Sequence, residues 1–368
     1  MAALAMVLFV LDRYHSPALA GFTVFAATAP GVIVSPLAGA LLDRHGRKWL
    51  IVLDQVVAAI ALFLVGALAL GNLLPPPLLL GIVFAQALTY PLSTAGARSL
   101  YPLLVPRRLW DRVNAVDSAL YVLATLIGPP IAGGLVAAAG GPVAIIALGL
   151  VFGASALVMT GITDPESDVT TTGSLLGDAL AGLRYVASNP SLRGLALCIS
   201  IFNAAGGIFA VAIPVLVFQR LHGGPALVGA LWAVLGAAGI ISGFAFGRLG
   251  SEGRERALLA GGLATGAVAT VLLAVAPNLA LFALAMALLG VSNGPTDIAL
   301  FSLRQRRTDQ AWLGRAFAVS MALNVVGVPV GAALAGPLIG ISLMATMGVA
   351  VAFTAVSALM PVTIPKEG

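Results

Sequence analysis

The stretch Gly39–Lys48, which reads GALLDRHGRK, decides how this chain folds. It follows a run over residues 16–42 that holds no charged side chain, and a second, mostly apolar run begins at Trp49. A helix needs about 20 apolar residues to cross the hydrocarbon core of a bilayer, so each run is long enough for one span. Gly39 and Gly46 allow close backbone approach and a sharp reversal. The stretch therefore predicts a short, charged turn between two membrane-spanning helices.

The composition of the whole chain favours a membrane protein built from many such helices. Apolar residues make up 60% of the 368 residues and charged residues 9%, against about 25% charged in soluble domains. The mean hydropathy is +1.06. Uncharged runs over 55–97, 118–163, 257–296 and 316–365 are each long enough for two helices and a minimal turn. We predict an all-α fold with twelve helices near 1–11, 18–42, 49–70, 78–100, 113–138, 143–163, 194–218, 226–247, 257–276, 279–302, 314–335 and 340–363.

The basic residues provide an independent check on this count, because cytoplasmic loops are enriched in Lys and Arg. Of the 19 basic residues, only Arg13 and Arg220 fall on the other side of the predicted topology. A miscounted helix would disturb this alternation. We therefore expect a multi-pass membrane protein with both termini of the full-length protein in the cytoplasm.

The first predicted helix is shorter than a span. A helix over 1–11 rises about 16 Å at about 1.5 Å per residue, roughly half the thickness of the hydrocarbon core. We expect that the chain begins inside this helix, through a late start assignment or a truncation. Polar positions that this helix would contribute to a central cavity are then missing.

The middle of the chain reads as a connection between two halves, 1–163 and 194–368. The connection, 164–193, opens with a polar stretch, and apolar residues then recur at helical spacing, which predicts an amphipathic helix along the cytoplasmic face. The halves echo each other at an offset of 204 residues, which relates Gly39 to Gly243 and Pro91 to Pro295. Such parallel repeats are a known architecture of membrane transporters.

Several other classes of protein lack their signatures here. No G-x-x-x-x-G-K-[ST] phosphate loop is present, so the sequence does not predict an ATP-driven pump. The three histidines are scattered in predicted loops without metal-ligand spacing, and the one cysteine excludes an internal disulfide framework. We expect no enzymatic activity, no metal, no cofactor and no nucleic-acid partner.

The charged turn resembles the signature loop between helices 2 and 3 of the major facilitator superfamily. Its members share the pattern G-x-L-a-D-r-x-G-r-k, and the residues in register here are Gly39, Leu41, Asp43, Arg44, Gly46, Arg47 and Lys48. The resemblance implies two six-helix bundles related by a pseudo-two-fold axis, in a protein of the bacterial inner membrane. The stretch 128–134, GPPIAGG, is similar to one found in exporters of this superfamily, and 104–107, 114–115 and 313–317 resemble its prokaryotic efflux branch, which includes siderophore exporters.

The resemblance implies a gating role for Gly39, Asp43, Arg44, Gly46, Arg47 and Lys48. We expect Asp43 to pair with a basic helix end across the halves, near Arg315, and to hold the cytoplasmic side closed in the outward-facing state. The alternative is a basic loop that sets topology and plays no part in gating.

The resemblance also implies that helices 1, 4, 7 and 10 line a central path. Candidate substrate contacts are therefore Gln86, Tyr90, Ser93, Asn203, Asn293 and Asn324. Hydrogen bonding between helices is the rival explanation for each of these side chains. Asp297 follows the break Asn293-Gly294-Pro295, and we expect it to couple protons or bind a substrate cation, the alternative being an ion pair near the cytoplasmic side.

We therefore predict a secondary transporter, a monomer, that exports a small amphipathic molecule by alternating access, driven by protons. One alternative is a uniporter or uptake carrier on the same scaffold. Another is a membrane sensor or assembly partner that transports nothing.

Overall fold

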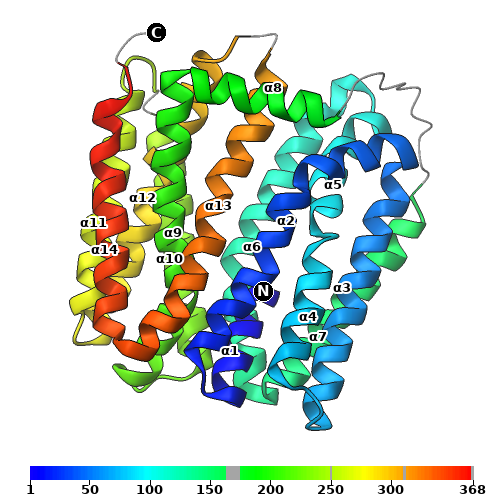
Figure 1. Ribbon diagram of the computed structural model, residues 1–368, viewed down its shortest axis with the longest axis vertical. Coiled ribbons are helices and arrows are strands. Elements are labelled where there is room, and N and C mark those ends of the chain that lie inside the picture. The colour runs from blue at the N-terminus through cyan, green and yellow to red at the C-terminus, as the bar shows by residue number, and fades with distance from the viewer. Residues whose placement is uncertain (163–174, 249–250, 310–311, 366–368) are drawn as a thin grey trace.

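The computed structural model describes residues 1–162, 175–248, 251–309 and 312–365, and these ranges contain helices and turns but no strand. The helices form the two predicted six-helix bundles, with one further helix between them (Figure 1). The first bundle contains α1 (Ala2–Tyr14), α2 (Pro17–His45), α3 (Arg47–Leu70), α4 (Pro76–Ala87), α5 (Tyr90–Leu104), η1 (Arg107–Leu109), α6 (Trp110–Ala139) and α7 (Gly141–Thr160). The second contains α9 (Pro190–Gln219), α10 (Pro225–Gly247), α11 (Glu255–Val275), α12 (Leu279–Arg306), α13 (Leu313–Ile341), α14 (Leu343–Leu359) and η3 (Met360–Thr363).

Within the described residues, 11 helical segments are long and apolar enough to cross a membrane. The pair α4 and α5 supplies one of them, and α1 is not among them because it has 13 residues. Helix α1 is nevertheless buried over much of its length, where Leu8, Phe9 and Val10 join the core of the bundles. The predicted all-α fold is confirmed, with helix 1 ending at Tyr14 and not near residue 11.

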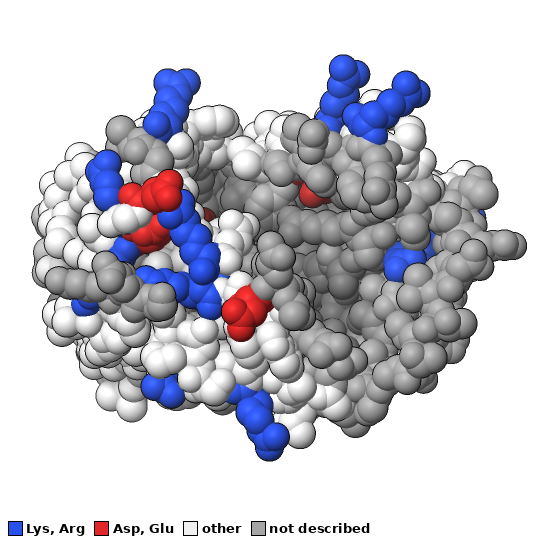
Figure 2. Space-filling view, turned by 90° about the horizontal axis from the view of Figure 1, so that it is seen from above, with Lys and Arg blue, Asp and Glu red and all other residues white. Residues whose placement is uncertain are grey.

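The bundle has two chemically different ends. Helix α8 (Leu175–Ser188), the α2–α3 turn and the end of α14 lie at one end, which we call the basic end (Figure 1). Lys and Arg side chains stand out on this end in Figure 2. We call the opposite end the glycine end, because glycines there bring the two bundles together, as described below.

The fourth predicted helix is broken where one continuous helix was expected. Helix α4 ends at Ala87 and α5 begins at Tyr90, with the backbone N–H groups of Leu88 and Thr89 bonding carbonyls three residues back. Pro91, in the first turn of α5, has no N–H to continue the α-helical ladder. Pro295, its counterpart at the 204-residue offset, lies inside the continuous helix α12.

The eleventh helix, predicted over 314–335, also ends later than expected, at Ile341. Helix α13 continues through Pro337 to Ile341, and the chain reverses at Ser342. The Ser342 hydroxyl accepts a hydrogen bond from the backbone N–H of Ala345 at 3.2 Å and caps α14. Gly336 serves a packing contact instead, since a Cβ there would lie 2.6 Å from the Cα of Ala18 in α2.

Arg13 and Arg220, which do not fit the predicted alternation of basic loops, both donate hydrogen bonds to neighbouring chain segments at the glycine end. Arg220 donates to the carbonyl of Ala274, at the end of α11, at 2.7 Å. Arg13 donates to the side-chain oxygen of Asn72, in the α3–α4 turn, at 3.1 Å. Cations are favourable at helix C-termini, where backbone carbonyls lack partners in the helix, and this accounts for Arg220 at this end.

Candidate functional site

At the glycine end, two pairs of helices from different bundles meet through glycines. In the first contact, which we call the α2–α13 seam, a Cβ on Gly21 would lie 2.5 Å from the carbonyl oxygen of Ala332. In the second, the α6–α10 seam, a Cβ on Gly229 would lie 2.5 Å from the carbonyl oxygen of Pro129, and one on Gly133 would press on that of Pro225. Such small residues let helix backbones approach closely in a membrane. The predicted stretch 128–134 is therefore part of a seam between the bundles.

At the basic end, the surface between the bundles is hollowed (Figure 2). The α6–α10 seam extends from Gly133 as far as Gly236, whose Cβ would lie 3.5 Å from the Cα of Leu126. Farther along α10, a Cβ on Gly243 or Gly247 would meet no heavy atom within 4 Å. Helices α6 and α10 are thus in close contact at the glycine end, and this contact does not extend to Gly243 and Gly247 at the basic end.

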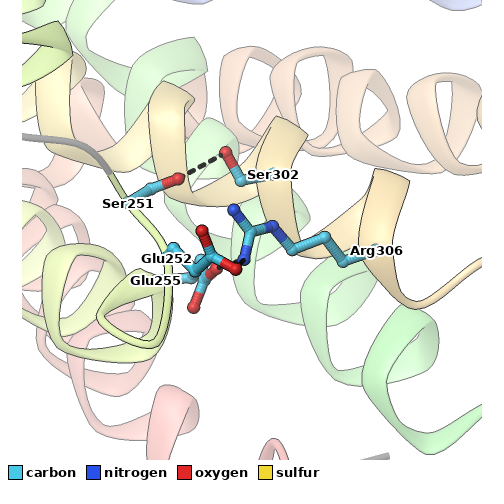
Figure 3. Close-up of polar contacts among 5 residues, drawn as sticks. All are labelled: Ser251, Glu252, Glu255, Ser302 and Arg306. Atoms are coloured by element: carbon cyan, nitrogen blue, oxygen red, sulfur yellow. Dashed lines mark hydrogen bonds and ion pairs between the residues drawn. The ribbon is translucent and has the colours of Figure 1, made fainter.

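The basic end of the second bundle is tied together by an ion pair. Arg306, at the end of α12, lies 3.1 Å from Glu255 and 3.6 Å from Glu252, both at the beginning of α11 or just before it (Figure 3). Ser251 donates a hydrogen bond to Ser302 beside this pair at 3.0 Å. This is the position that the α2–α3 turn occupies in the first bundle, so the second copy of the turn holds its neighbouring helices through carboxylates.

The predicted gating loop is described only in part. Gly46 separates α2 from α3 with φ 83 and ψ 146, a conformation that favours glycine. Lys48 lies 5.0 Å from the ring centre of Trp49, which is exposed as interfacial tryptophans are. The surroundings of Gly39 and the side chains of Asp43, Arg44 and Arg315 lie outside what the structure describes. The pairing of Asp43 with Arg315 therefore stays a prediction.

The polar residues predicted in helix 4 divide between two roles. Thr89 donates a hydrogen bond of 2.7 Å to Asp54 of α3, and Gln55 of α3 donates one of 3.3 Å to Ser93. Asp54 is 2% exposed, so this bond satisfies a carboxyl group buried between α3 and the break that separates α4 from α5. Ser93 thus makes a hydrogen bond between helices, which is the alternative to substrate contact for this side chain.

Two other predicted cavity residues of this region are more accessible. Tyr90 is 54% exposed, and Gln86 is half-buried one turn before it, on the last turn of α4. These two side chains remain candidates for substrate contact.

A second polar cluster joins α9, α12 and α13. The side-chain amide of Asn203 donates to the backbone carbonyl of Asn324 at 2.9 Å. With the Asn324 amide oriented so that both its groups are satisfied, its oxygen accepts from Arg304 at 2.8 Å and its nitrogen donates to the Ser320 carbonyl at 3.1 Å. Asn203 and Asn324 therefore bond between helices in this conformation, and Asn324 is only 4% exposed.

Arg304 is a residue that sequence reasoning missed, since it was assigned to a cytoplasmic loop. It lies inside α12 and is 0% exposed, one of the largest fully buried side chains. Its guanidinium also lies 5.8 Å from the ring centre of Phe301. The spacing of Asn293, Asp297 and Arg304 places all three on one face of a helix, and that signal could have extended the predicted helix beyond residue 302.

Asp297 lies in the middle of this face, where α12 is not covered. Its side chain is exposed, while Leu300 and Arg304 on the same face are buried. No hydrogen bond or ion pair joins Asp297 to another residue in the described part of the chain. Asn293, one turn away, is half-buried and faces α10, since its amide nitrogen lies 3.7 Å from a Cβ built on Gly239. Asp297 is thus an accessible carboxyl group within a membrane-spanning helix.

The described residues contain no group of three or more His, Cys, Asp or Glu side chains that could hold a metal ion. The features described for the candidate site are an accessible carboxyl group, hydrogen bonds between helices and two glycine seams.

Comparisons with known proteins agree with this architecture. Residues 1–332 match the family described as the Major Facilitator Superfamily. An uncharacterised MFS-type transporter, y4rN, of Sinorhizobium fredii is 36% identical over 100% of this chain and 91% of its own length. The multidrug efflux pump Tap of Mycolicibacterium fortuitum is 27% identical over 89% of this chain and 82% of the pump.

Two further likenesses are to a second exporter and to a solved structure. The enterobactin exporter EntS of Shigella boydii is 27% identical over 88% of this chain and 77% of the exporter. The crystal structure of the nucleoside transporter NupG superposes with a TM-score of 0.75 at 13% identity, covering 99% of this chain and 96% of NupG. The fold, the repeated bundles and the family match lead to one conclusion: the chain belongs to the major facilitator superfamily of membrane transporters.

Proposed function

We propose that this chain is a secondary active transporter that exports small amphipathic molecules in exchange for protons. The observation that carries the proposal is Asp297, which is exposed inside a membrane-spanning helix without a partner in the described residues. An ionisable group at such a position is costly, and it is retained where it serves transport.

The coupling follows from what protonation does to the cost of closing the cavity. A carboxylate is expensive to enclose in a medium of low dielectric constant, whereas the neutral acid is cheaper to enclose. Protonation of Asp297 therefore favours conformations in which the bundles close around it. A cationic group on a substrate neutralises the same carboxylate, so substrate and proton compete for one site, and this competition produces exchange.

The moving parts in this proposal are the halves 1–163 and 194–368, joined by the segment 164–193. The two glycine seams hold the halves together at one end, and the hollow at the basic end gives access from the other. With the basic end in the cytoplasm, as the distribution of Lys and Arg favours, the described conformation accepts substrate from inside the cell. The gating residues Gly39, Asp43, Arg44, Gly46, Arg47 and Lys48 are then at the mouth that must close.

Export and amphipathic substrates are supported by the relatives. Two of them are named as an efflux pump for multiple drugs and as an exporter of enterobactin. The accessible Tyr90 and Gln86 of the first half and the carboxyl group of Asp297 in the second suit a molecule with an apolar body and a polar or charged group.

The proposal is tested in proteoliposomes that contain the purified chain and an imposed pH gradient. Ethidium and enterobactin are the two probes, and their movement is measured with the gradient in each direction and with none. We expect gradient-driven movement of at least one probe, and Asp297→Asn should abolish the dependence on the gradient. Glu252→Gln is the matched control, because it neutralises a carboxylate at the surface of the basic end.

Each other outcome contradicts a part of the proposal. Flux that is equal with and without the gradient identifies a uniporter. Accumulation of either probe toward the side with the lower proton concentration identifies a symporter. Gradient dependence that persists in Asp297→Asn removes Asp297 from coupling. No movement of any probe, from protein that is monodisperse and inserted, favours a membrane sensor.

A further inference from the structure

Helix α8 has three distinct faces, although an amphipathic helix needs only two. Gly182 and Val186 are buried against the protein, and Val186 is 1% exposed. Leu180 and Leu183, which are 62% and 42% exposed, lie beside this face. Arg184 is exposed farther around the helix, on the side away from Val186. Contact with the bundles therefore explains the buried face of α8 but not its exposed leucines.

The buried face of α8 is held firmly on the second bundle. Tyr185 stacks on Trp312 with ring centres 4.9 Å apart and an interplanar angle of 9°. The Tyr185 hydroxyl also lies 3.1 Å from the carboxylate of Asp309 and accepts a hydrogen bond from the Asp309 backbone N–H. Just after α8, the amide of Asn189 donates to the carbonyl of Arg307 at 3.0 Å. These contacts fix the rotation of α8 about its own axis, so the direction of its leucine face is also fixed.

The leucine face lies at the level where the membrane surface is expected. Helix α8 runs across the ends of the spans, on the flank where α13 and α2 are neighbours (Figure 1). The α2–α3 turn is at the same end, and the exposed Trp49 beside Lys48 marks it as interfacial. Exposed leucines at this level continue the apolar flank of the spans, and the flank of a membrane protein is covered by acyl chains.

The charges beside the leucine face are positive. Arg184 is exposed on α8, and Arg193 is exposed just after it, with its guanidinium bonded to the last-turn carbonyl of Ala187 at 3.0 Å. Basic side chains beside an apolar helix face are the composition of helices that bind membranes of anionic lipid.

We propose that α8 is an interfacial anchor: Leu180 and Leu183 insert into the leaflet at the basic end, and Arg184 and Arg193 bind the headgroups of anionic phospholipids there. The anchor is attached to the second bundle through Tyr185 and Asn189, and it touches α2 of the first bundle. The surrounding lipid is thereby linked mechanically to the side of the cavity mouth formed by α2 and α13. This inference does not depend on the substrate or on proton coupling.

The experiment uses single nitroxide labels on the full chain in vesicles. Cys198 is the one cysteine and is fully buried, so Cys198→Ala provides the background. Labels are attached at Leu180→Cys and Leu183→Cys, and at Ser188→Cys as the matched control on the exposed polar side of the same helix. Accessibility to oxygen, which partitions into lipid, is compared with accessibility to a water-soluble nickel chelate. The vesicles contain phosphatidylcholine and phosphatidylglycerol at a ratio of about 3:1 or phosphatidylcholine alone.

We expect both leucine positions to favour oxygen over nickel and the Ser188 position to favour nickel. In vesicles without phosphatidylglycerol, or when Arg184 and Arg193 are both changed to Gln, the oxygen-to-nickel ratio at Leu180 and Leu183 should fall at least twofold. Preference for nickel at all three positions would overturn the anchor. Exclusion of both reagents with an immobilised spectrum at the leucines would overturn it in favour of a protein partner. A ratio that is equal in the two lipid mixtures would overturn the role of the anionic headgroups.

Discussion

Gly133 and Gly134 are adjacent in α6, and only one of them faces the other bundle, which gives a controlled test of the glycine seams. A Cβ added to Gly133 would press on the carbonyl oxygen of Pro225 and lie 3.1 Å from the Cα of Gly229. A Cβ added to Gly134 would meet no heavy atom within 4 Å. Both substitutions by Ala change helix propensity by the same amount. The difference between the two variants therefore measures the effect of the added methyl group on the α6–α10 seam.

The expected magnitude follows from what the new methyl group would meet. Its neighbours are backbone atoms of α10, which cannot rotate away as a side chain would. Overpacking of this kind costs about 1–3 kcal/mol. A free-energy change of about 1.36 kcal/mol corresponds to a factor of ten in an equilibrium constant. Gly133→Ala should therefore shift the equilibrium between bundles in contact and bundles apart at the glycine end by about 5- to 150-fold toward the separated form. Gly134→Ala should leave this ratio unchanged.

The assay is the distance distribution between spin labels on the two bundles at the glycine end. Leu73, in the α3–α4 turn, and Leu279, at the beginning of α12, are both exposed and are changed to Cys in a Cys198→Ala background. Gly133→Ala should add or enlarge a population at longer distances. Identical distributions for Gly133→Ala and Gly134→Ala would refute the reasoning that the α6–α10 seam holds this end closed.

Two further predictions concern hydrogen bonds between the spans, and both are measured as the midpoint of thermal unfolding in detergent. Thr89→Val leaves the buried carboxyl group of Asp54 without the hydroxyl that donates to it and should cost about 1–3 kcal/mol. Thr94→Val is its control, because that hydroxyl bonds carbonyls of its own helix, and equal midpoints for the two would contradict the role of Thr89. Asn324→Leu removes an acceptor of the fully buried Arg304 and should cost about 1.5–3 kcal/mol, so an unchanged midpoint would show that this bond does not stabilise the second bundle.

The spans could be predicted from the sequence because the membrane imposes a simple rule on them. Uncharged runs of sufficient length must become helices, since backbone groups in hydrocarbon have no other partner. The distribution of Lys and Arg then fixed the alternation of the loops, and α8 was found by its periodicity. At the turn between α2 and α3, Gly46 adopts a positive φ, as the glycine at this position indicated.

Helix ends and side-chain partners could not be predicted in the same way. Gly336-Pro337 has the composition of a turn, yet the neighbouring α2 makes Gly336 a packing residue and the helix continues. The predicted helix ended before Arg304 because a charge normally ends a span, and the facing Asn324, whose side-chain oxygen accepts a hydrogen bond from Arg304, helps to explain why it is buried. Ser93 and Asn203 have the polarity of substrate contacts, but the residues that bond them lie on other helices. These decisions depend on tertiary neighbours, which one sequence does not specify.

The two seams also constrain the path between conformations. The pseudo-two-fold axis relates the α2–α13 contact to the α6–α10 contact, so they flank this axis on opposite sides. A rigid tilt of one bundle that separates α2 from α13 must also separate α6 from α10. Neither contact can therefore stay fixed as a hinge while the other opens. The two seams at the glycine end therefore open together in a single conformational step. A substitution that weakens one seam also weakens the other.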